Sequence, residues 1–127
     1  EFLPYGGLRR MIEADRPTVV FLDDIGQSPE AVQAAMTMSE VFPHIDFKRE
    51  VTIGHLMLDI TSKAAELAKV NPPIRPREDV EFMWEALLAG ELDWVVSDHA
   101  CCQQEMKIPK HYFGNIWMAK SGFGGTE

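Results

Sequence analysis

Residues 76–99, PREDVEFMWEALLAGELDWVVSDH, contain a complete helix-to-strand unit. A proline followed by acidic residues is typical of a helix start. Apolar residues then recur at helical spacing, at Val80, Met83, Trp84, Leu87 and Leu88. Gly90 is placed to end this helix. The mostly apolar residues 92–97 predict a buried strand, which brings Asp98 and His99 to its carboxyl end.

Two further strands are predicted nearer the N-terminus. Residues Thr18–Leu22 (TVVFL) form a β-branched and aromatic run, the pattern of a strand buried on both faces. Residues Phe47–Met57 predict another strand, which Gly54 interrupts where the backbone must bend or approach another group closely. Both runs have the length of strands rather than of long helices.

Helices are predicted between these strands. Ser28 can cap a helix with Pro29 at its first position, and Pro43 closes it. The apolar face of that helix consists of Ala31, Val32, Ala35 and Met36. A short helix is expected over Leu8–Ala14 and a helical turn over Ser62–Ala68, whereas the tail from Ile108 shows no period and is expected to be a loop.

The order strand, helix, strand, helix, strand predicts an α/β fold built from parallel β-α-β-α-β units. In such sheets chemistry collects beyond the carboxyl ends of the strands. Asp23, Asp24, Asp98 and His99 all follow predicted strands. A carboxylate at such a place can hold a divalent cation and accept a proton from its bound water, although an aspartate there is more often a turn or capping residue.

The composition narrows the class of protein. With 127 residues, 46% of them hydrophobic, the chain is long enough for one core. A net charge of −8 would repel a phosphate backbone, so no nucleic-acid partner is expected. A membrane is not expected as a partner either, because no apolar run approaches the length of about 20 residues that a membrane span needs. Cys101 and Cys102 are adjacent and cannot join distant segments, which favours a reducing, cytoplasmic setting. The chain begins Glu1-Phe2, without an initiator Met, which fits a fragment.

Four blocks of sequence carry a resemblance to a known family. They are EVTIGHLML (residues 50–58), KVNPPIR (residues 69–75), DWVVSDHA (residues 93–100) and GFGGTE (residues 122–127). Together they resemble the seventh and eighth strand regions of the cyclic amidohydrolases, the group that includes dihydroorotase, dihydropyrimidinase, hydantoinase and allantoinase. The resemblance covers residues 44–127. It implies part of a (β/α)8 barrel that hydrolyses a cyclic amide.

The resemblance also implies roles for individual residues. Asp98 matches the family aspartate that contacts the metal and transfers the proton, first as general base and then as general acid. Asn71 matches the asparagine that hydrogen-bonds the substrate ring, and the backbone of Gly122 and Gly124 matches the loop that closes over it. Without the resemblance, Asn71 is a residue held extended by Pro72, and the glycines form an ordinary turn.

The chain departs from the family pattern in two ways. Cys101 and Cys102 stand where dihydroorotases continue with Pro-His, which favours a hydantoin-like or other cyclic amide over dihydroorotate. The first-strand His-x-His pair is absent from the sequence, so zinc is expected only if other residues or chains complete the site around Asp98. The isolated chain is therefore expected to be inactive. His55 is interpreted as a structural histidine, and His99 with the two cysteines as a poor metal site.

Residues 1–43 have a less certain origin. Residues 5–36 resemble the Walker B region of AAA-type ATPases of the MoxR kind, but no phosphate-binding loop accompanies them. Alternatively, Phe21-Leu22 and Ser28–Val32 derive from the sixth strand and helix of the amidohydrolase barrel. The sequence thus reads as a single α/β domain or fragment, with residues 1–43 as a strand-helix unit and residues 44–127 as the barrel segment.

Two classes of function remain open at this stage. One is an incomplete cyclic amidohydrolase that acts on a small cyclic amide. The other is a non-catalytic α/β module, or a fusion of fragments, that forms a homo-oligomer through open sheet edges. An ATPase remnant is a weaker third alternative, because the phosphate-binding loop is missing.

Overall fold

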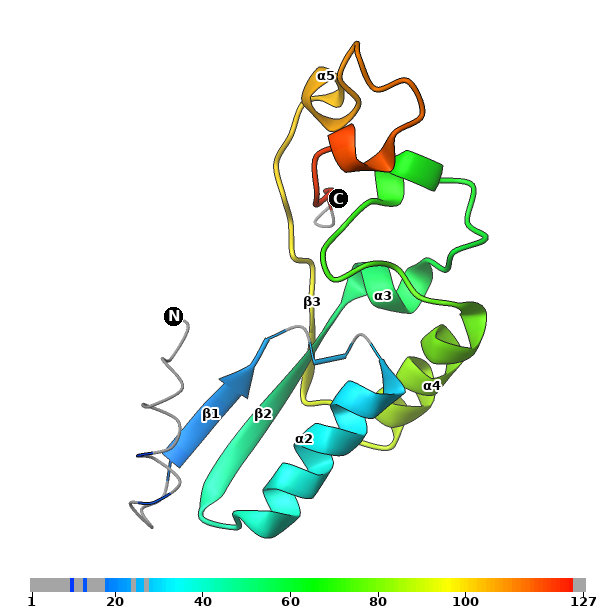
Figure 1. Ribbon diagram of the computed structural model, residues 1–127. Helices are drawn as coiled ribbons and strands as arrows, with labels where there is room; N and C mark the ends of the chain where they lie inside the picture. The colour runs from blue at the N-terminus through cyan, green and yellow to red at the C-terminus, as the bar shows by residue number, and fades with distance from the viewer. Residues whose placement is uncertain (1–9, 11–12, 14–17, 24, 27, 125–127) are drawn as a thin grey trace.

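Three parallel strands form the centre of the fold (Figure 1). The computed structural model describes Arg10, Glu13 and residues 18–23, 25–26 and 28–124. In the order β1-β2-β3, the strands are β1 (Thr18–Leu22), β2 (Ile45–Thr52) and β3 (Trp94–Val96). Thr18 pairs with Ile45, and Glu50 pairs with Trp94. The predicted α/β class and parallel strand order are confirmed. Most of the helix expected over Leu8–Ala14 lies outside the described residues.

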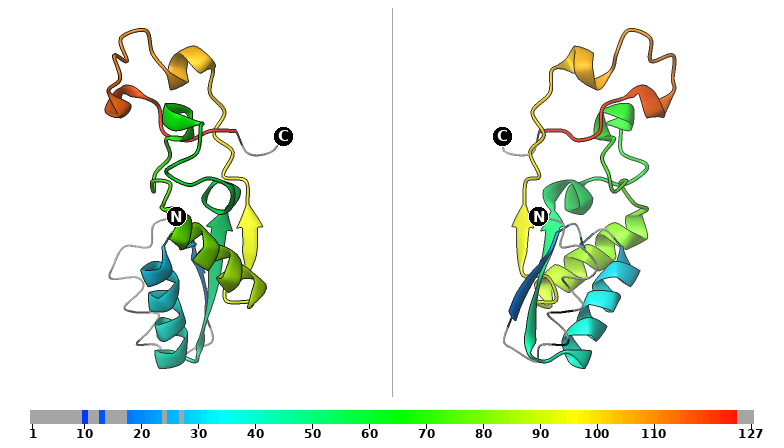
Figure 2. Two further views of the ribbon diagram at one scale, coloured as in Figure 1. Left: turned by 90° about the vertical axis from the view of Figure 1, so that its right-hand side faces the viewer. Right: turned by 60° about the vertical axis from the view of Figure 1, so that its left-hand side comes forward.

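Two helices cover the same face of this sheet (Figure 2). Helix α2 spans Pro29–Val41, and the Ser28 hydroxyl oxygen accepts a hydrogen bond from Ala31 N at 3.3 Å, as the N-cap prediction requires. Helix α4 spans Arg77–Leu88. Both helices were predicted, because in each the spacing of the apolar residues and the proline at the helix start indicate the same segment.

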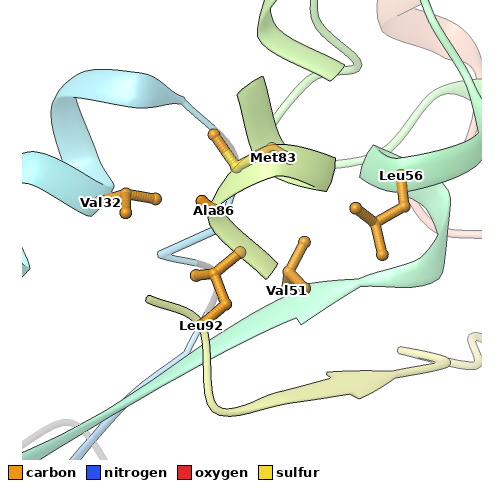
Figure 3. Close-up of a cluster of buried hydrophobic side chains, with 6 residues drawn as sticks. All are labelled: Val32, Val51, Leu56, Met83, Ala86 and Leu92. Atoms are coloured by element: carbon orange, nitrogen blue, oxygen red, sulfur yellow. The ribbon is translucent and has the colours of Figure 1, made fainter. Parts of the chain in front are cut away.

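The core lies between the helices and the sheet. One buried cluster joins Val32, Val51, Leu56, Met83, Ala86 and Leu92 (Figure 3). A second cluster joins β1 and β2 through Val20, Ile45 and Phe47, with Met38 and Phe42 packed against it. Alternate residues of the strands therefore face the helices, and the residues between them face the opposite side.

Helix α4 ends as its sequence predicts, but the apolar face that it packs against the sheet is narrower than predicted. Gly90 has φ +78°, and the backbone N–H groups of Gly90 and Glu91 donate to Leu87 O and Ala86 O, which is a Schellman end. Leu88, which was assigned to the packed side, has 82% of its surface exposed. It occupies the last helical position, beyond the edge of the sheet-facing stripe.

The predictions that Thr18–Leu22 is buried on both faces and that residues 92–97 form a buried strand are wrong. Val19 and Phe21 in β1 are 52% and 63% exposed, and Val95 in β3 is 42% exposed. The predicted strand over residues 92–97 is also shortened to Trp94–Val96. The reason is that α2 and α4 cover one face, while β1 and β3 each pair on one side only within the described part of the chain.

The second strand begins and ends earlier than predicted. It stops at Thr52, and Ile53–Met57 form the short helix α3. The Thr52 hydroxyl oxygen accepts a hydrogen bond from His55 N at 3.4 Å and thereby caps this helix. Gly54 does approach another group closely, as predicted, because a Cβ at Gly54 would lie 2.6 Å from Phe123 Cζ.

Beyond the carboxyl ends of the strands, residues 58–76 and 97–124 form a region with little regular structure (Figure 1). It contains 3₁₀ turns at Ala65–Ala68 and Ile116–Met118 and the short helix α5 (Gln104–Lys107). The expected turn within residues 62–68 is therefore present, and the described part of the tail, residues 108–124, is a loop with one 3₁₀ turn. No helix in the described residues is long and apolar enough to cross a membrane.

Candidate active site

Asp98 lies just beyond β3, at the carboxyl end of the sheet, and its side chain is exposed. Its φ is +45°, a left-handed conformation that aspartate tolerates better than most residues. His99, which follows it, approaches the tail, since a Cβ at Gly124 would lie 3.5 Å from His99 Cε1. The end of β3 and the tail loop are thus neighbours.

Two backbone hydrogen bonds hold the Gly122–Gly124 loop in this position. Ala100 N donates to Phe123 O at 3.0 Å, and Gly122 N donates to Lys69 O at 3.0 Å. Gly122 is buried and has φ +87°, and a Cβ on it would lie 2.5 Å from Ala100 Cβ. Only glycine fits this conformation and this close approach without displacement. The loop is therefore fixed between the segment after Asp98 and the segment before Asn71.

Asn71 is exposed, and a hydrogen bond from His55 to the next residue, Pro72, anchors the segment that carries it. The His55 ring is 3% exposed, its Nε2 lies 3.1 Å from Pro72 O, and its Nδ1 lies 2.7 Å from Thr52 Oγ1. A carbonyl can only accept, so Nε2 carries the proton of this contact. Both ring nitrogens are therefore engaged in structural hydrogen bonds.

Sequence reasoning missed Lys107, which is a central residue of this region. It is 4% exposed, and its ammonium group donates to Lys69 O at 2.7 Å, Lys120 O at 2.8 Å and Gly122 O at 2.6 Å. Burial lowers the pKa of Lys107; the negative charge that Cys102 carries when ionised acts to raise it, and the positive charge of Lys69 lowers it further. The sequence offers no specific signal for it, because a lysine in a polar segment is too common to single it out.

The described residues do not by themselves fit a zinc ion. No group of three or more His, Cys, Asp or Glu side chains in the described part of the chain could hold a metal. A structural or catalytic zinc site needs about three or four protein ligands. Asp98 could contribute one ligand, Asp23 is exposed at the end of β1, and Asp24 lies outside the described residues. The Cys101 and Cys102 thiols are free.

A hollow of about 200 Å³ adjoins the Asn71 segment rather than Asp98. Its lining includes Ile60, Lys69, Val70, Pro73 and Ile116. The predicted site residues do not line this hollow. The geometry therefore brings Asp98 close to the Gly122–Gly124 loop through Ala100, and connects Asn71 to that loop through Lys69.

A segment of this chain is similar in sequence to cyclic amidohydrolases, and its fold is similar to part of an amidohydrolase barrel. No protein family model matches the chain. The allantoinases of Salmonella paratyphi B and Salmonella newport are each 48% identical to it over 61 residues. These alignments cover 48% of this chain and 12% of each allantoinase, so the chain spans only a small part of the relatives it matches.

Solved structures extend the similarity to most of the chain. The L-hydantoinase (dihydropyrimidinase) from Arthrobacter aurescens matches 92% of this chain and 26% of its own, with 26% identity and a TM-score of 0.67. The D-hydantoinase (dihydropyrimidinase) from Thermus sp. matches 84% of this chain and 23% of its own, with 26% identity and a TM-score of 0.64. Residues 44–127 are about two-thirds of the chain, so a match over 92% also takes in part of residues 1–43. The resemblance of residues 5–36 to the Walker B region rests on the sequence alone.

Proposed function

We propose that this chain supplies the proton-transferring and substrate-contacting segment of a hydrolase that opens cyclic amides such as hydantoin or dihydrouracil. The observation that carries the proposal is the hydrogen bond between Ala100 N and Phe123 O, which holds the Gly122–Gly124 loop next to the residues that follow Asp98. A carboxylate and a main-chain loop are thereby available to one small ligand. The segment is incomplete and is expected to be inactive alone.

Asp98 is proposed as the general base and then the general acid. Its carboxylate is exposed at the carboxyl end of β3, where parallel α/β sheets collect their reacting groups. It would accept a proton from the attacking water and return it to the leaving amide nitrogen. The left-handed backbone at Asp98 turns the chain away from the strand direction immediately after β3.

Asn71 and the Gly122–Gly124 backbone are proposed as the groups that bind the ring. A cyclic amide presents N–H donors and carbonyl acceptors; the Asn71 side chain offers both kinds of partner, and a main-chain carbonyl such as Gly122 O, which has a second lone pair, offers an acceptor. Asn71 is exposed, and Gly122 N donates a hydrogen bond to the carbonyl of Lys69, which lies two residues before Asn71. Zinc is proposed only where ligands beyond the described residues join Asp98, because the described residues do not fit it.

Ring binding can be tested with the purified chain itself. Titration of a ¹⁵N-labelled sample with hydantoin is expected to shift the amide signals of Asn71, Gly122 and Gly124 in a saturable way. Asn71→Ala should weaken this binding, whereas Gln33→Ala, which removes the same side-chain group from the exposed side of α2, should not. A folded wild-type sample without saturable shifts at these amides would contradict the proposal.

Proton transfer requires the rest of a barrel and is tested by complementation. This chain is co-expressed with the part of the Arthrobacter aurescens L-hydantoinase that it does not match, and the opening of hydantoin is followed. We expect Asp98→Asn to lower the rate by about 100-fold or more, the usual contribution of a general acid-base group. Glu85→Gln, which removes an exposed carboxylate from α4, should leave it unchanged. Turnover retained by Asp98→Asn would remove the assigned role.

A second candidate is a non-catalytic module that associates with its own copies, and the open face of the sheet favours it. Phe21 and Trp94 lie on the face opposite the helices, with ring centroids 5.6 Å apart, and Val19 is exposed on the same face. Exposed apolar side chains on one face of a sheet can mark a contact with another protein chain. Strand edges also offer unpaired backbone groups to another copy.

The native mass of the purified chain tests this second candidate. If the open face mediates self-association, the wild type is an oligomer by light scattering, and Phe21→Ser shifts it to the monomer. Leu88→Ser is the matched control, because Leu88 is 82% exposed on α4, on the other side of the sheet. A wild type that stays monomeric at high concentration would contradict self-association.

A further inference from the structure

We propose that Lys107 is a positioning residue that fixes the Gly122–Gly124 loop relative to the Asn71 segment, and so sets the geometry of the substrate-binding groups. This inference rests on the function proposed above, since it concerns the same loop and the same asparagine. Lys107 itself is not proposed to touch the substrate.

The Lys107 ammonium joins three segments of the chain: its own helix α5, the segment that contains Lys69, and the tail that contains Lys120 and Gly122. Its three acceptors are the carbonyls of Lys69, Lys120 and Gly122, at 2.7, 2.8 and 2.6 Å. An ammonium group has three N–H donors, so each donor has one acceptor. Hydrogen bonds from a charged donor are shorter and stronger than those between neutral groups. One side chain therefore links the helix α5 segment to both binding segments.

The Lys69 carbonyl is the point at which the two binding segments meet. It accepts hydrogen bonds from both Lys107 Nζ and Gly122 N, and it belongs to the block that continues through Val70 to Asn71. Displacement of the ammonium would leave the Gly122 carbonyl and the Lys69 carbonyl without their shared donor. The position of Gly122 relative to Asn71 thus depends on the Lys107 ammonium together with the direct hydrogen bond from Gly122 N to Lys69 O.

Apolar packing gives this loop little independent support. The Phe123 ring lies against Gly54 and has the Lys107 ammonium 5.8 Å from its centroid. Apart from this ring, polar contacts predominate, including Lys69 Nζ to Ala119 O at 2.6 Å and Lys120 N to Lys107 O at 3.1 Å. A neutral side chain at position 107 would leave the buried Gly122 carbonyl without this donor, whereas the Lys69 carbonyl would keep its hydrogen bond from Gly122 N.

The test compares the wild type with three variants of the full chain by amide hydrogen exchange. Lys107→Met should speed exchange at Gly122 N and Ala100 N by about tenfold or more, the loss expected for hydrogen bonds to a charged group. Exchange at Val51, a fully buried residue of β2, should not change. Lys107→Arg should preserve part of the protection, and Lys110→Met, which alters an exposed lysine nearby, should preserve all of it.

Chemical rescue separates positioning from general destabilisation. Lys107→Ala should regain protection at Gly122 when propylammonium, which replaces the missing atoms, is added. Tetramethylammonium has the charge but no N–H donor and should not rescue. In the same samples, hydantoin affinity should fall with Lys107→Ala and return with propylammonium.

Each outcome decides between the two proposals. Unchanged exchange at Gly122 and Ala100 in a folded Lys107→Met would overturn the positioning role. Equal loss of protection at Val51 and Gly122, without rescue by propylammonium, would also overturn it, because it would indicate unfolding alone. If the loop loosens and is rescued but the wild type never binds hydantoin, the positioning role stands and the proposed function fails.

Discussion

The sheet region, residues 18–57 and 77–96, and the loop region, residues 58–76 and 97–124, are stabilised by different interactions. Nearly all the buried apolar side chains belong to the sheet region, where two clusters fill the space under α2 and α4. Among the described residues, the loop region buries only Val70 and Ala119 among its hydrophobic side chains. Lysine and histidine hydrogen bonds to backbone carbonyls hold it together instead.

This difference determines how each region responds to substitution. Apolar packing spreads the stabilisation over many contacts, so the sheet region depends on the sum of its side-chain volumes. The loop region depends on a few donors that each satisfy one or more carbonyls. All four candidate site residues, Asn71, Asp98, Gly122 and Gly124, lie in the loop region. Site geometry should therefore be sensitive to single polar side chains, and global stability to the core.

The largest expected effect is in the core of the sheet region. Met83 is 1% exposed and belongs to the main buried cluster, so Met83→Ala should lower the free energy of unfolding by about 2–5 kcal/mol. Urea unfolding measures this change. Leu88→Ala on the same helix should cost less than about 0.5 kcal/mol, because Leu88 is largely exposed. Similar costs for the two variants would mean that α4 does not pack as described.

The next effect tests close packing in the loop region. Gly122→Ala and Gly114→Ala both place a Cβ at positive φ, +87° and +77°, which costs about 1–2 kcal/mol. Only Gly122→Ala also meets Ala100 Cβ, at 2.5 Å, whereas nothing lies within 4 Å at Gly114. We expect an additional cost of about 1–3 kcal/mol for Gly122→Ala, the usual range for overpacking. Equal unfolding midpoints would contradict the contact between the tail and Ala100.

A smaller effect is expected at the junction of the two regions. His55→Leu keeps an apolar body but removes the partners of Thr52 Oγ1 and Pro72 O. The cost should be about 1–3 kcal/mol, with faster amide exchange in the segment around Asn71. His111→Leu provides the control, because His111 is exposed. A variant at position 55 with unchanged stability and exchange would show that the histidine does not anchor this segment.

The smallest expected effect is on the pH dependence of stability, through Asp93 in the sheet region. Burial acts to raise the pKa of Asp93, but hydrogen bonds from Arg49 N, at 2.8 Å, and from the Arg49 guanidinium, together with the charges of Arg49 and Lys48, lower it overall. A lowered pKa in the folded state stabilises the fold above the unfolded value, 3.8, and this contribution is lost as the pH falls through the folded value.

Asp93→Asn should therefore reduce the loss of stability on acidification below about pH 4. Urea midpoints measured from neutral pH to about pH 2.5 would show a shallower slope for this variant than for the wild type. Glu85→Gln is the control, since it removes an exposed carboxylate from α4. An identical slope for wild type and Asp93→Asn would mean that the Arg49 contacts do not favour the ionised form.

The sequence alone determined the parallel order of the strands, both long helices and the position of Asp98 after β3, because hydrophobic period, proline starts and the Gly90 end are local properties. The resemblance in blocks such as KVNPPIR and DWVVSDHA was also readable without coordinates. Only the tertiary structure decided that β2 ends at Thr52, that Phe21 faces an open side, and that Lys107 joins Lys69 to Gly122. Those features depend on which distant backbone groups meet, and a sequence pattern records side-chain periodicity but not long-range contacts.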